Sequence, residues 1–426
     1  MKAWPAGLRI GFRFCFVYVI LYCLSNQIFS SMFPIPSVDQ PDLATLWPMR
    51  AGVIWVAQHL FRVTTPLVYM GSGSGDKTFD WVLVFCLISV SCIAAAAWSV
   101  LDRKRTSYAR LSNWLLLIVR VAMVSQLLAY GFAKAVPLQM PYPYLFKLLE
   151  PLRNFSPMGV LWTSVGASPA YEMFTGCAEI AGGILLIFPR TVTLGALVAL
   201  ADMTQVFTLN LTYDVPVKLL SFQLILLSLL LLAPNMRQLA RFFFSNRQAA
   251  LEGPRPLFAS MRANRIAGAV LALVWLWMLG NNIYGDWSAW RQYGGGRTKS
   301  ALYGVWNVEQ LAIDGKSQPL DVSNKAEWRR VIFDFPTLTQ VELMDDSITG
   351  FNSSLDSGKK TLALTRRGDK NVQARFSFTK PSPDKLVLDG VLDGHQEHIV
   401  LGLMDWKKFP LASRGFHWIQ EYPFNH

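Results

Sequence analysis

The stretch that decides the fold is LNLTYDVPVKLLSFQLILL, residues 209–227. It ends one apolar run and opens another, and it places Asp214, Pro216 and Lys218 between the two. Two long apolar runs joined by so short a polar segment predict a helical hairpin within a membrane. Asp214 is expected to cap the second helix, and Pro216 suits that helix's first turn.

The whole composition agrees with lipid as the solvent. The chain has 426 residues, of which 52% are hydrophobic and 16% are charged, whereas about a quarter of the residues in a soluble domain are charged. A membrane-spanning helix needs about 20 mostly apolar residues. Runs that meet this need are predicted at 10–30, 80–101, 112–134, 170–188, 191–211, 217–233 and 266–284. The weaker run 43–66 carries Arg50, His59 and Arg62, which favours an interfacial helix.

Charge then predicts the orientation of the bundle. If the helices alternate, the cation-rich segments all fall on one side of the membrane. These cations are Lys2, Arg9, Arg13, Arg103, Lys104, Arg105, Arg110, Arg190, Arg237, Arg241, Arg247, Arg255, Arg262 and Arg265. The positive-inside rule then predicts a bacterial cytoplasmic (inner) membrane protein with a cytoplasmic N-terminus and an extracytoplasmic C-terminal domain. The net charge of +12 reflects this topology and does not indicate nucleic acid as a partner.

After residue 290 the pattern changes. A Gly-rich linker, RQYGGGRTKS, precedes a region at 303–404 that alternates with period two. About eight short antiparallel strands are expected, which indicates a small all-β barrel or sandwich, with the barrel preferred. The domains are therefore predicted as 1–290, transmembrane and helical, and 300–426, an extracytoplasmic β-barrel. GVWNVE resembles the first strand of lipocalin-like barrels, and that resemblance implies that Trp306 closes the barrel floor with Arg414 stacked upon it.

Three other features carry no chemistry in this interpretation. GSGSGDKT, residues 71–78, lacks the adjacent Gly-Lys of a phosphate loop and is expected to be a flexible turn. His395 and His398 fall on opposite faces of a predicted strand, so no metal site is predicted. The five cysteines lie in predicted helices and are expected to act as small buried hydrophobes.

Polar residues inside the helices are the candidate ligand-binding groups, because charge at membrane depth usually faces a bundle interior or a wet cavity. They are Gln126, Tyr130, Lys134, Glu172, Glu179, Asp202, Gln205, Asp214 and Lys218. One polar pocket that opens outward is predicted. Two alternatives stay open. In one, Glu179 and Asp202 form interhelical hydrogen bonds or ion pairs, with Arg120 as one partner. The other concerns Lys218, which pairs either with Asp214 or with one of Glu172 and Glu179.

A family resemblance follows from residues 112–234, which resemble the four-helix DoxX family. It is carried by Arg120, by Gly131 to Lys134, and by the E-x-x-G-G that starts at Glu179. A longer DoxX-like subgroup adds helices and an external β domain. One branch of the family is similar to a membrane subunit of thiosulfate:quinone oxidoreductase, which implies a quinone as cofactor or partner. The resemblance assigns no catalytic residue here.

Three functional hypotheses result. In the first, the protein is redox-linked and binds a quinone or a similar lipid-soluble molecule. Because the sequence offers no obvious haem, flavin or iron–sulfur ligation, electrons come either from a partner subunit or by direct chemistry. In the second, it is a non-enzymatic scaffold or assembly factor whose β domain holds an extracytoplasmic protein. In the third, it carries an apolar ligand, since eight-stranded barrels can hold one small molecule.

Overall fold

The chain forms two compact units. The computed structural model describes residues 3–35, 38, 40–245, 256–321, 324, 327–369 and 373–425. The first unit joins Met1–Gln139 to Ala170–Ala289, and the second joins Met140–Pro169 to Trp290–His426. The sequence placed a boundary near residue 290 but left the segment 135–170 with the helices. The structure groups Met140–Pro169 with the β-strands instead.

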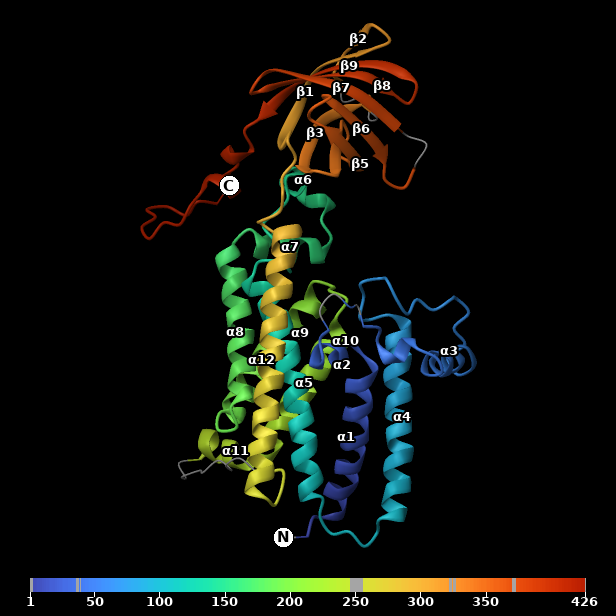
Figure 1. Ribbon diagram of the computed structural model, residues 1–426, viewed down its shortest axis with the longest axis vertical. Helices are drawn as coiled ribbons and strands as arrows, with labels where there is room; N and C mark the ends of the chain where they lie inside the picture. The colour runs from blue at the N-terminus through green and yellow to red at the C-terminus, as the bar shows by residue number, and fades with distance from the viewer. Residues whose placement is uncertain are drawn as a thin grey trace. The chain divides into compact units, whose positions relative to one another are not determined.

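The first unit is a bundle of long helices (Figure 1). Among the described residues, seven helices are long and apolar enough to cross a membrane, which confirms the predicted number. They are α1 (Ala6–Ser25), α4 (Thr78–Leu101), α5 (Ala109–Ala135), α8 (Pro169–Ile187), α9 (Val192–Thr212), the helical stretch Lys218–Phe244 that begins with α10 (Lys218–Leu232), and α12 (Met261–Gln292). The predicted helix 266–284 is therefore longer at both ends.

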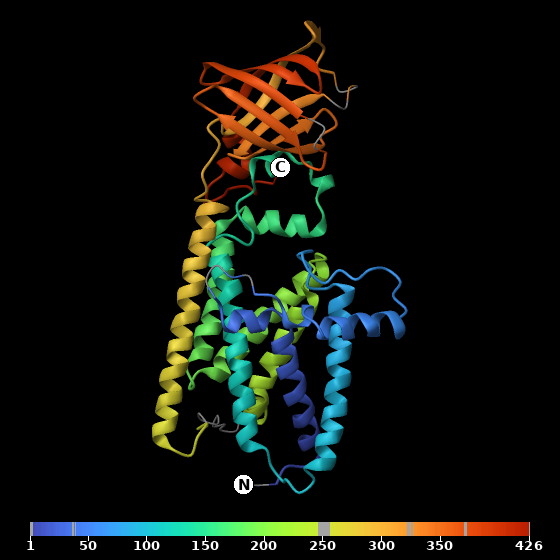
Figure 2. The same ribbon diagram turned by 45° about the vertical axis from the view of Figure 1, so that its right-hand side comes forward.

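Shorter helices of this unit run across the long ones (Figures 1 and 2). They are α2 (Gln27–Met32), η1 (Leu43–Thr45), α3 (Met49–His59), η3 (Ala233–Asn235) and α11 (Met236–Phe244). With 11 residues, α3 is too short to cross a bilayer. Trp47 lies just before α3 and Trp55 lies within it, and both side chains are exposed. Tryptophan is enriched at membrane interfaces. The interfacial interpretation of this segment is thus supported.

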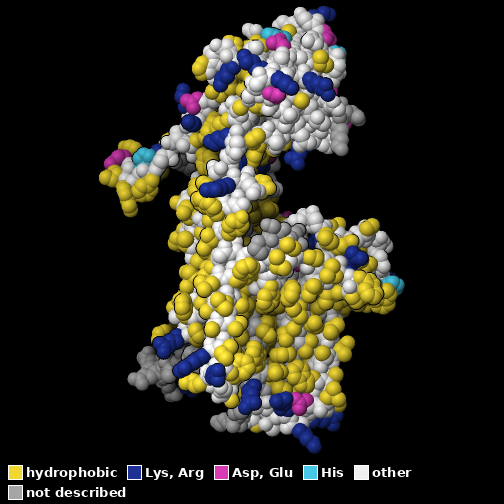
Figure 3. Space-filling model, in the orientation of Figure 1, with side chains coloured by type: hydrophobic (Ala, Val, Ile, Leu, Met, Phe, Trp, Pro, Cys, Tyr) yellow, Lys and Arg dark blue, Asp and Glu magenta, His cyan; other side chains and the backbone are white. Residues whose placement is uncertain are grey.

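The surface of the helical unit suits a bilayer. Apolar side chains cover its middle, and Lys and Arg side chains gather at the end where the N-terminus lies (Figure 3). Ile93 and Leu273 are 70% and 67% exposed, which lipid contact explains. At the basic end, Arg13 donates to the Tyr108 hydroxyl at 2.8 Å and to Ser99 Oγ at 2.7 Å. Lys2, Arg247 and Arg255 lie outside the described residues.

The second unit contains a closed β-barrel. Its strands are β1 (Gly304–Ile313), β2 (Lys316–Gln318), β3 (Trp328–Phe335), β4 (Leu338–Leu343), β5 (Ile348–Asp356), β6 (Thr361–Arg366), β7 (Gln373–Ser382), β8 (Lys385–Leu392) and β9 (His395–Met404). Each pairs antiparallel with the next in the order β2-β1-β3 to β9, and β1 also pairs with β9. Eight strands therefore close an up-and-down barrel, with β2 as a short flap on β1, as the sequence predicted.

Large apolar side chains fill the barrel. Along β7, buried Ala374, Phe376 and Phe378 alternate with exposed neighbours, and they join one core with Trp306. Trp306 is buried and donates from Nε1 to the Leu302 carbonyl at 2.9 Å. The prediction that Arg414 stacks on Trp306 was wrong. Lys380 Nζ lies 5.6 Å from the Trp306 ring centroid, because β7 brings it there. Arg414 lies over Phe424.

The segment between α5 and α8 docks on this barrel. It contains α6 (Leu145–Leu149), η2 (Leu152–Asn154) and α7 (Pro157–Gly166). The Leu145 amide donates to the fully buried Asp334 carboxylate at 3.0 Å, and Arg297 forms an ion pair with the same carboxylate. Leu145 also packs on Val305 and Ile332. A buried carboxylate that accepts from both partners makes this docking specific.

Candidate functional site

Two glycines let α5 and α8 touch backbone to backbone. A Cβ on Gly176 would lie 2.5 Å from the Gly131 carbonyl oxygen and 2.5 Å from the Ala135 nitrogen. Small residues are typical of such close approaches in membranes. Gly182 faces Ala199 of α9, and Gly183 faces Leu128 of α5. All three α8 glycines named here therefore lie at contacts with a neighbouring helix.

This close approach creates a buried ion pair. Lys134 Nζ of α5 lies 2.5 Å from Glu179 Oε1 of α8, and both side chains are less than a tenth exposed. One turn earlier on α5, the Tyr130 hydroxyl accepts from Gln27 Nε2 at 2.8 Å. The same Gln27 nitrogen donates to Gln126 Oε1 at 3.3 Å. These five side chains, from α2, α5 and α8, thus form a polar seam in the bundle.

Of the remaining predicted residues, some lie near this seam and others lie apart from it. Asp202 of α9 is half-buried and within electrostatic range of Glu179 and Lys134. Gln205 is exposed on the same helix, and Glu172 is buried in the first turn of α8. The alternative in which Arg120 binds Glu179 or Asp202 was wrong, because the Arg120 guanidinium donates to the Ile187 carbonyl at 2.7 Å. It caps the end of α8 there.

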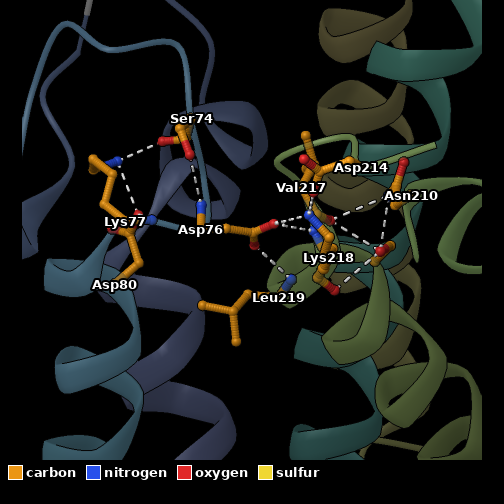
Figure 4. Close-up of polar contacts among 10 residues, drawn as sticks. Ser74, Asp76, Lys77, Asp80, Asn210, Asp214, Val217, Lys218 and Leu219 are labelled. Atoms are coloured by element: carbon orange, nitrogen blue, oxygen red, sulfur yellow. Dashed lines mark hydrogen bonds and ion pairs between the residues drawn. The ribbon is translucent and has the colours of Figure 1, made fainter. Parts of the chain in front are cut away.

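Lys218 and Asp214 belong to a different group, centred on Asp76 (Figure 4). The Asp76 carboxylate points at the start of α10 and accepts from the backbone N–H of Lys218 at 2.8 Å and of Leu219 at 2.9 Å. Lys218 Nζ lies 3.0 Å from Asp214 Oδ1 and 3.7 Å from Asp76 Oδ2. A carboxylate at a helix N-terminus satisfies free N–H groups and complements the helix dipole.

Two sequence predictions need correction at this point, and one open alternative is decided. Asp214 does not cap α10: it lies in the preceding turn with φ of 52° and an 83% exposed side chain. The loop 71–77 is no free turn, because Gly75 N–H donates to the Pro216 carbonyl at 2.9 Å and Asp76 holds the helix. Lys218 pairs with Asp214, as one of the two alternatives had it, and also with Asp76, and with neither Glu172 nor Glu179. The cation in the first turn is compensated by the Asp76 carboxylate that caps the helix.

The second group borders a cavity among α1, α4, α9 and α10. This cavity has a volume of about 500 Å³. Its wall is mostly aromatic and aliphatic, with Trp81 of α4 and Phe207 of α9 as examples. Lys218 lies on its wall together with Gln223 and Tyr18, and Gln223 Nε2 donates to the Tyr18 hydroxyl at 2.7 Å. An apolar cavity with a few polar groups is the usual form of a small-molecule site.

Several residues of these groups escaped the sequence interpretation. Asp76 lies 142 positions from Lys218, and no periodicity links positions so far apart. Gln27, Tyr18 and Gln223 lay within predicted helices, where lone polar residues could have been added to the candidates. Asp286 fell just beyond the predicted end of the last helix, although α12 continues to Gln292.

Metal and thiol chemistry have no obvious centre in the described part of the chain. No group of three or more His, Cys, Asp or Glu there could hold a metal ion. Of the five cysteines, Cys23 is buried, whereas Cys92 and Cys177 are exposed on their helices. The prediction that all five are buried was therefore wrong. Exposed cysteine on an apolar helix face is compatible with lipid contact, since the thiol behaves as a small hydrophobe.

Comparison with known proteins adds one similarity. A Bacillus subtilis (strain 168) protein described as "Uncharacterized protein YwoB" is 34% identical over 84 residues, which are 20% of this chain and 54% of that protein. The chain thus spans about half the length of the curated relative it matches. No family model and no solved structure matches. The DoxX resemblance accordingly stays a prediction.

Proposed function

We propose that this membrane protein is DoxX-like and redox-linked, and that it binds a quinone or a similar lipid-soluble molecule in the cavity bordered by Lys218. The observation that carries the proposal is a cavity of about 500 Å³ with a mainly apolar wall and a lysine on that wall. An apolar wall selects a lipid-soluble molecule, and a cationic donor selects a head with acceptor oxygens. Both properties belong to quinones.

Lys218 is the residue to which we assign the polar head. Its present partner Asp214 is exposed, and an exposed ion pair is weak enough to be exchanged for a ligand. Asp76 stays on the backbone of α10 and keeps the lysine at the cavity wall. The hydrogen-bonded Gln223 and Tyr18 offer a second polar contact. Lys134 is not assigned to the ligand, because Glu179 already occupies it in a buried pair.

The remaining parts of the proposal concern place and partner. Seven spans and the basic N-terminal end support a bacterial cytoplasmic membrane with the N-terminus in the cytoplasm and the barrel on the extracytoplasmic side. Electrons for a redox-linked role would come from a protein partner, for which the barrel offers an extracytoplasmic surface.

The test measures quinone binding to the full chain in lipid nanodiscs. Binding is monitored through quenching of the fluorescence of Trp81, which lies on the cavity wall. A water-soluble short-chain quinone should quench wild type, and Trp81→Phe should remove that part of the quenching. Lys218→Met should weaken binding about tenfold or more, because a charged hydrogen bond is lost. Lys77→Met is the matched control, because Lys77 lies in the neighbouring loop and pairs with Asp80 of α4. This variant should bind the quinone as tightly as wild type does. Equal affinity in wild type and Lys218→Met would refute the proposal.

A scaffold function is a second candidate, supported by the exposed C-terminal segment. Phe416, Trp418, Ile419 and Tyr422 are each at least three-quarters exposed, and large apolar side chains left exposed together often mark a partner surface. Deleting residues 415–426 should then abolish recovery of one dominant protein after cross-linking on intact cells. Unchanged recovery would exclude this role. The filled barrel interior argues against the carrier hypothesis.

A further inference from the structure

A second cavity lies in the helical unit, between the segment around α2 and the far end of α12. Its volume is about 350 Å³. Ser30 and Ser31 of α2, Gln40, and Asn281, Asn282 and Asp286 of α12 provide its polar wall. Trp277 of α12 donates from Nε1 to the Pro34 carbonyl at 2.9 Å and ties the two walls together. None of these residues belongs to the cavity at Lys218.

Both hydroxyls and one N–H of each side-chain amide in this wall are already engaged within the protein. Ser30 and Ser31 hydroxyls both donate to the Gln27 carbonyl at 2.9 Å, and Gln40 Nε2 donates to the Phe33 carbonyl at 2.9 Å. Asn281 and Asn282 each donate from Nδ2 to the carbonyl four residues earlier, at 2.8 Å. What remains is two hydroxyl oxygens and three amide oxygens as acceptors, and the second N–H of each of the three amides, so acceptor atoms outnumber free N–H donors.

Asp286 gives this acceptor set a negative charge. Its Oδ2 is buried and has no hydrogen-bond partner. Among the described residues, no Lys, Arg or His forms an ion pair with it. A carboxylate removed from water without a countercharge or donor is costly. A cavity with an unpaired buried carboxylate oxygen and more acceptor atoms than free donors is complementary to a cationic ligand rich in donors.

We infer that this cavity binds a protonated amine, with the ammonium group on Asp286 and its remaining N–H donors on the amide and hydroxyl oxygens. An ammonium carries three donors and no acceptor, which matches the wall. A divalent metal fits less well, because Ca²⁺ requires about six to eight oxygen ligands around one point and the cavity offers one carboxylate. The amine can come from a free alkylamine or from the headgroup of an aminolipid such as phosphatidylethanolamine.

The experiment uses the full chain in a maltoside detergent, which carries no amine. In one arm, ethylamine and 1,4-diaminobutane are titrated by calorimetry. In the other, phosphatidylethanolamine or phosphatidylglycerol is added, and native mass spectrometry counts the retained lipids. Wild type should bind an amine, or retain the aminolipid in preference to phosphatidylglycerol, and the arm that responds identifies the source. Asp286→Asn should weaken that binding by about tenfold to about a hundredfold, the range for a charged hydrogen bond.

Two further variants separate binding from folding. Asn282→Asp adds a second carboxylate to the wall and should tighten binding, which a misfolded protein would not do. Asp405→Asn is the matched control, because Asp405 pairs with Lys408 in the second unit; it should bind as wild type. The inference is overturned if wild type binds neither amine nor aminolipid more tightly than Asp286→Asn, or if Asn282→Asp leaves the affinity unchanged.

Discussion

Two lysines of the helical unit, Lys134 and Lys218, occupy opposite environments. Lys134 is buried against one acid, Glu179, at 2.5 Å, between helices that touch at glycines. Lys218 is a quarter exposed, shares two acids at 3.0 and 3.7 Å, and borders a cavity. Both lysines would be classed as functional by the general rule that a charged residue within a membrane segment is functional. The difference teaches that a charge whose buried partner is complete holds helices together, whereas one with an exposed partner and an adjacent cavity can exchange it for a ligand.

The largest expected effect tests the structural role of the first pair. Lys134→Met leaves Glu179 buried without its cation and should lower the free energy of unfolding by about 3–5 kcal/mol. Lys134→Met with Glu179→Leu removes both charges and should return within about 1 kcal/mol of wild type, since an apolar pair can replace a buried ion pair. Unfolding by SDS in mixed micelles measures both. A double variant as unstable as the single one would contradict a purely structural pair.

The cap at the second lysine should have a smaller effect. Asp76→Ala removes the acceptor of the Lys218 and Leu219 amides and should cost about 2 kcal/mol, at the upper end for an N-cap. The same SDS titration measures it, and quinone binding should weaken because Lys218 loses its anchor. Asp214→Asn is the contrast: its pair is exposed and Asn tolerates positive φ. A change of at most about 0.5 kcal/mol is expected there. Equal losses in the two variants would break the assignment of the cap to Asp76.

Glu397 in the barrel extends the comparison to a buried acid that forms no ion pair with a lysine in the described part of the chain. Burial, together with the nearby Asp393 carboxylate, raises the pKa of Glu397 to about 7, although His395 partly offsets the shift. The folded state thus holds a proton that the unfolded state releases near pH 4.5, so stability falls as pH rises from about 4.5 to about 7, by about 1–2 kcal/mol after solvent screening.

Glu397→Gln should remove that fall. Calorimetry of the barrel transition in the full chain, at about pH 5 and about pH 8, measures the difference between variant and wild type. His395 contributes a fall of the same sign, because its hydrogen bond to Asp314 raises its pKa and that stabilisation is lost as the imidazole deprotonates. The fall that remains in Glu397→Gln belongs to His395. A pH dependence that the substitution leaves unchanged would remove Glu397 from the account.

Local sequence patterns predicted the elements well and their partners poorly. Apolar length predicted the spans, because a helix must satisfy its own backbone in lipid. Gln126, Tyr130 and Lys134 are four residues apart, and this spacing by itself puts them on one helix face. The pairing of Lys134 with Glu179 stayed open, because it depends on how closely α5 and α8 approach. The cap of α10 was missed because its acceptor, Asp76, belongs to a loop that only folding brings to that helix.

By itself the sequence determined a membrane bundle followed by a β-barrel, since hydropathy and the period-two pattern are local properties of the chain. Only the tertiary structure decided which charges neutralise each other, which loop caps α10, and that the segment Met140–Pro169 docks on the barrel. The physical reason is that ion pairs and hydrogen bonds act over a few ångströms between residues far apart in the chain. Their energy therefore depends on packing, which no short stretch of sequence encodes.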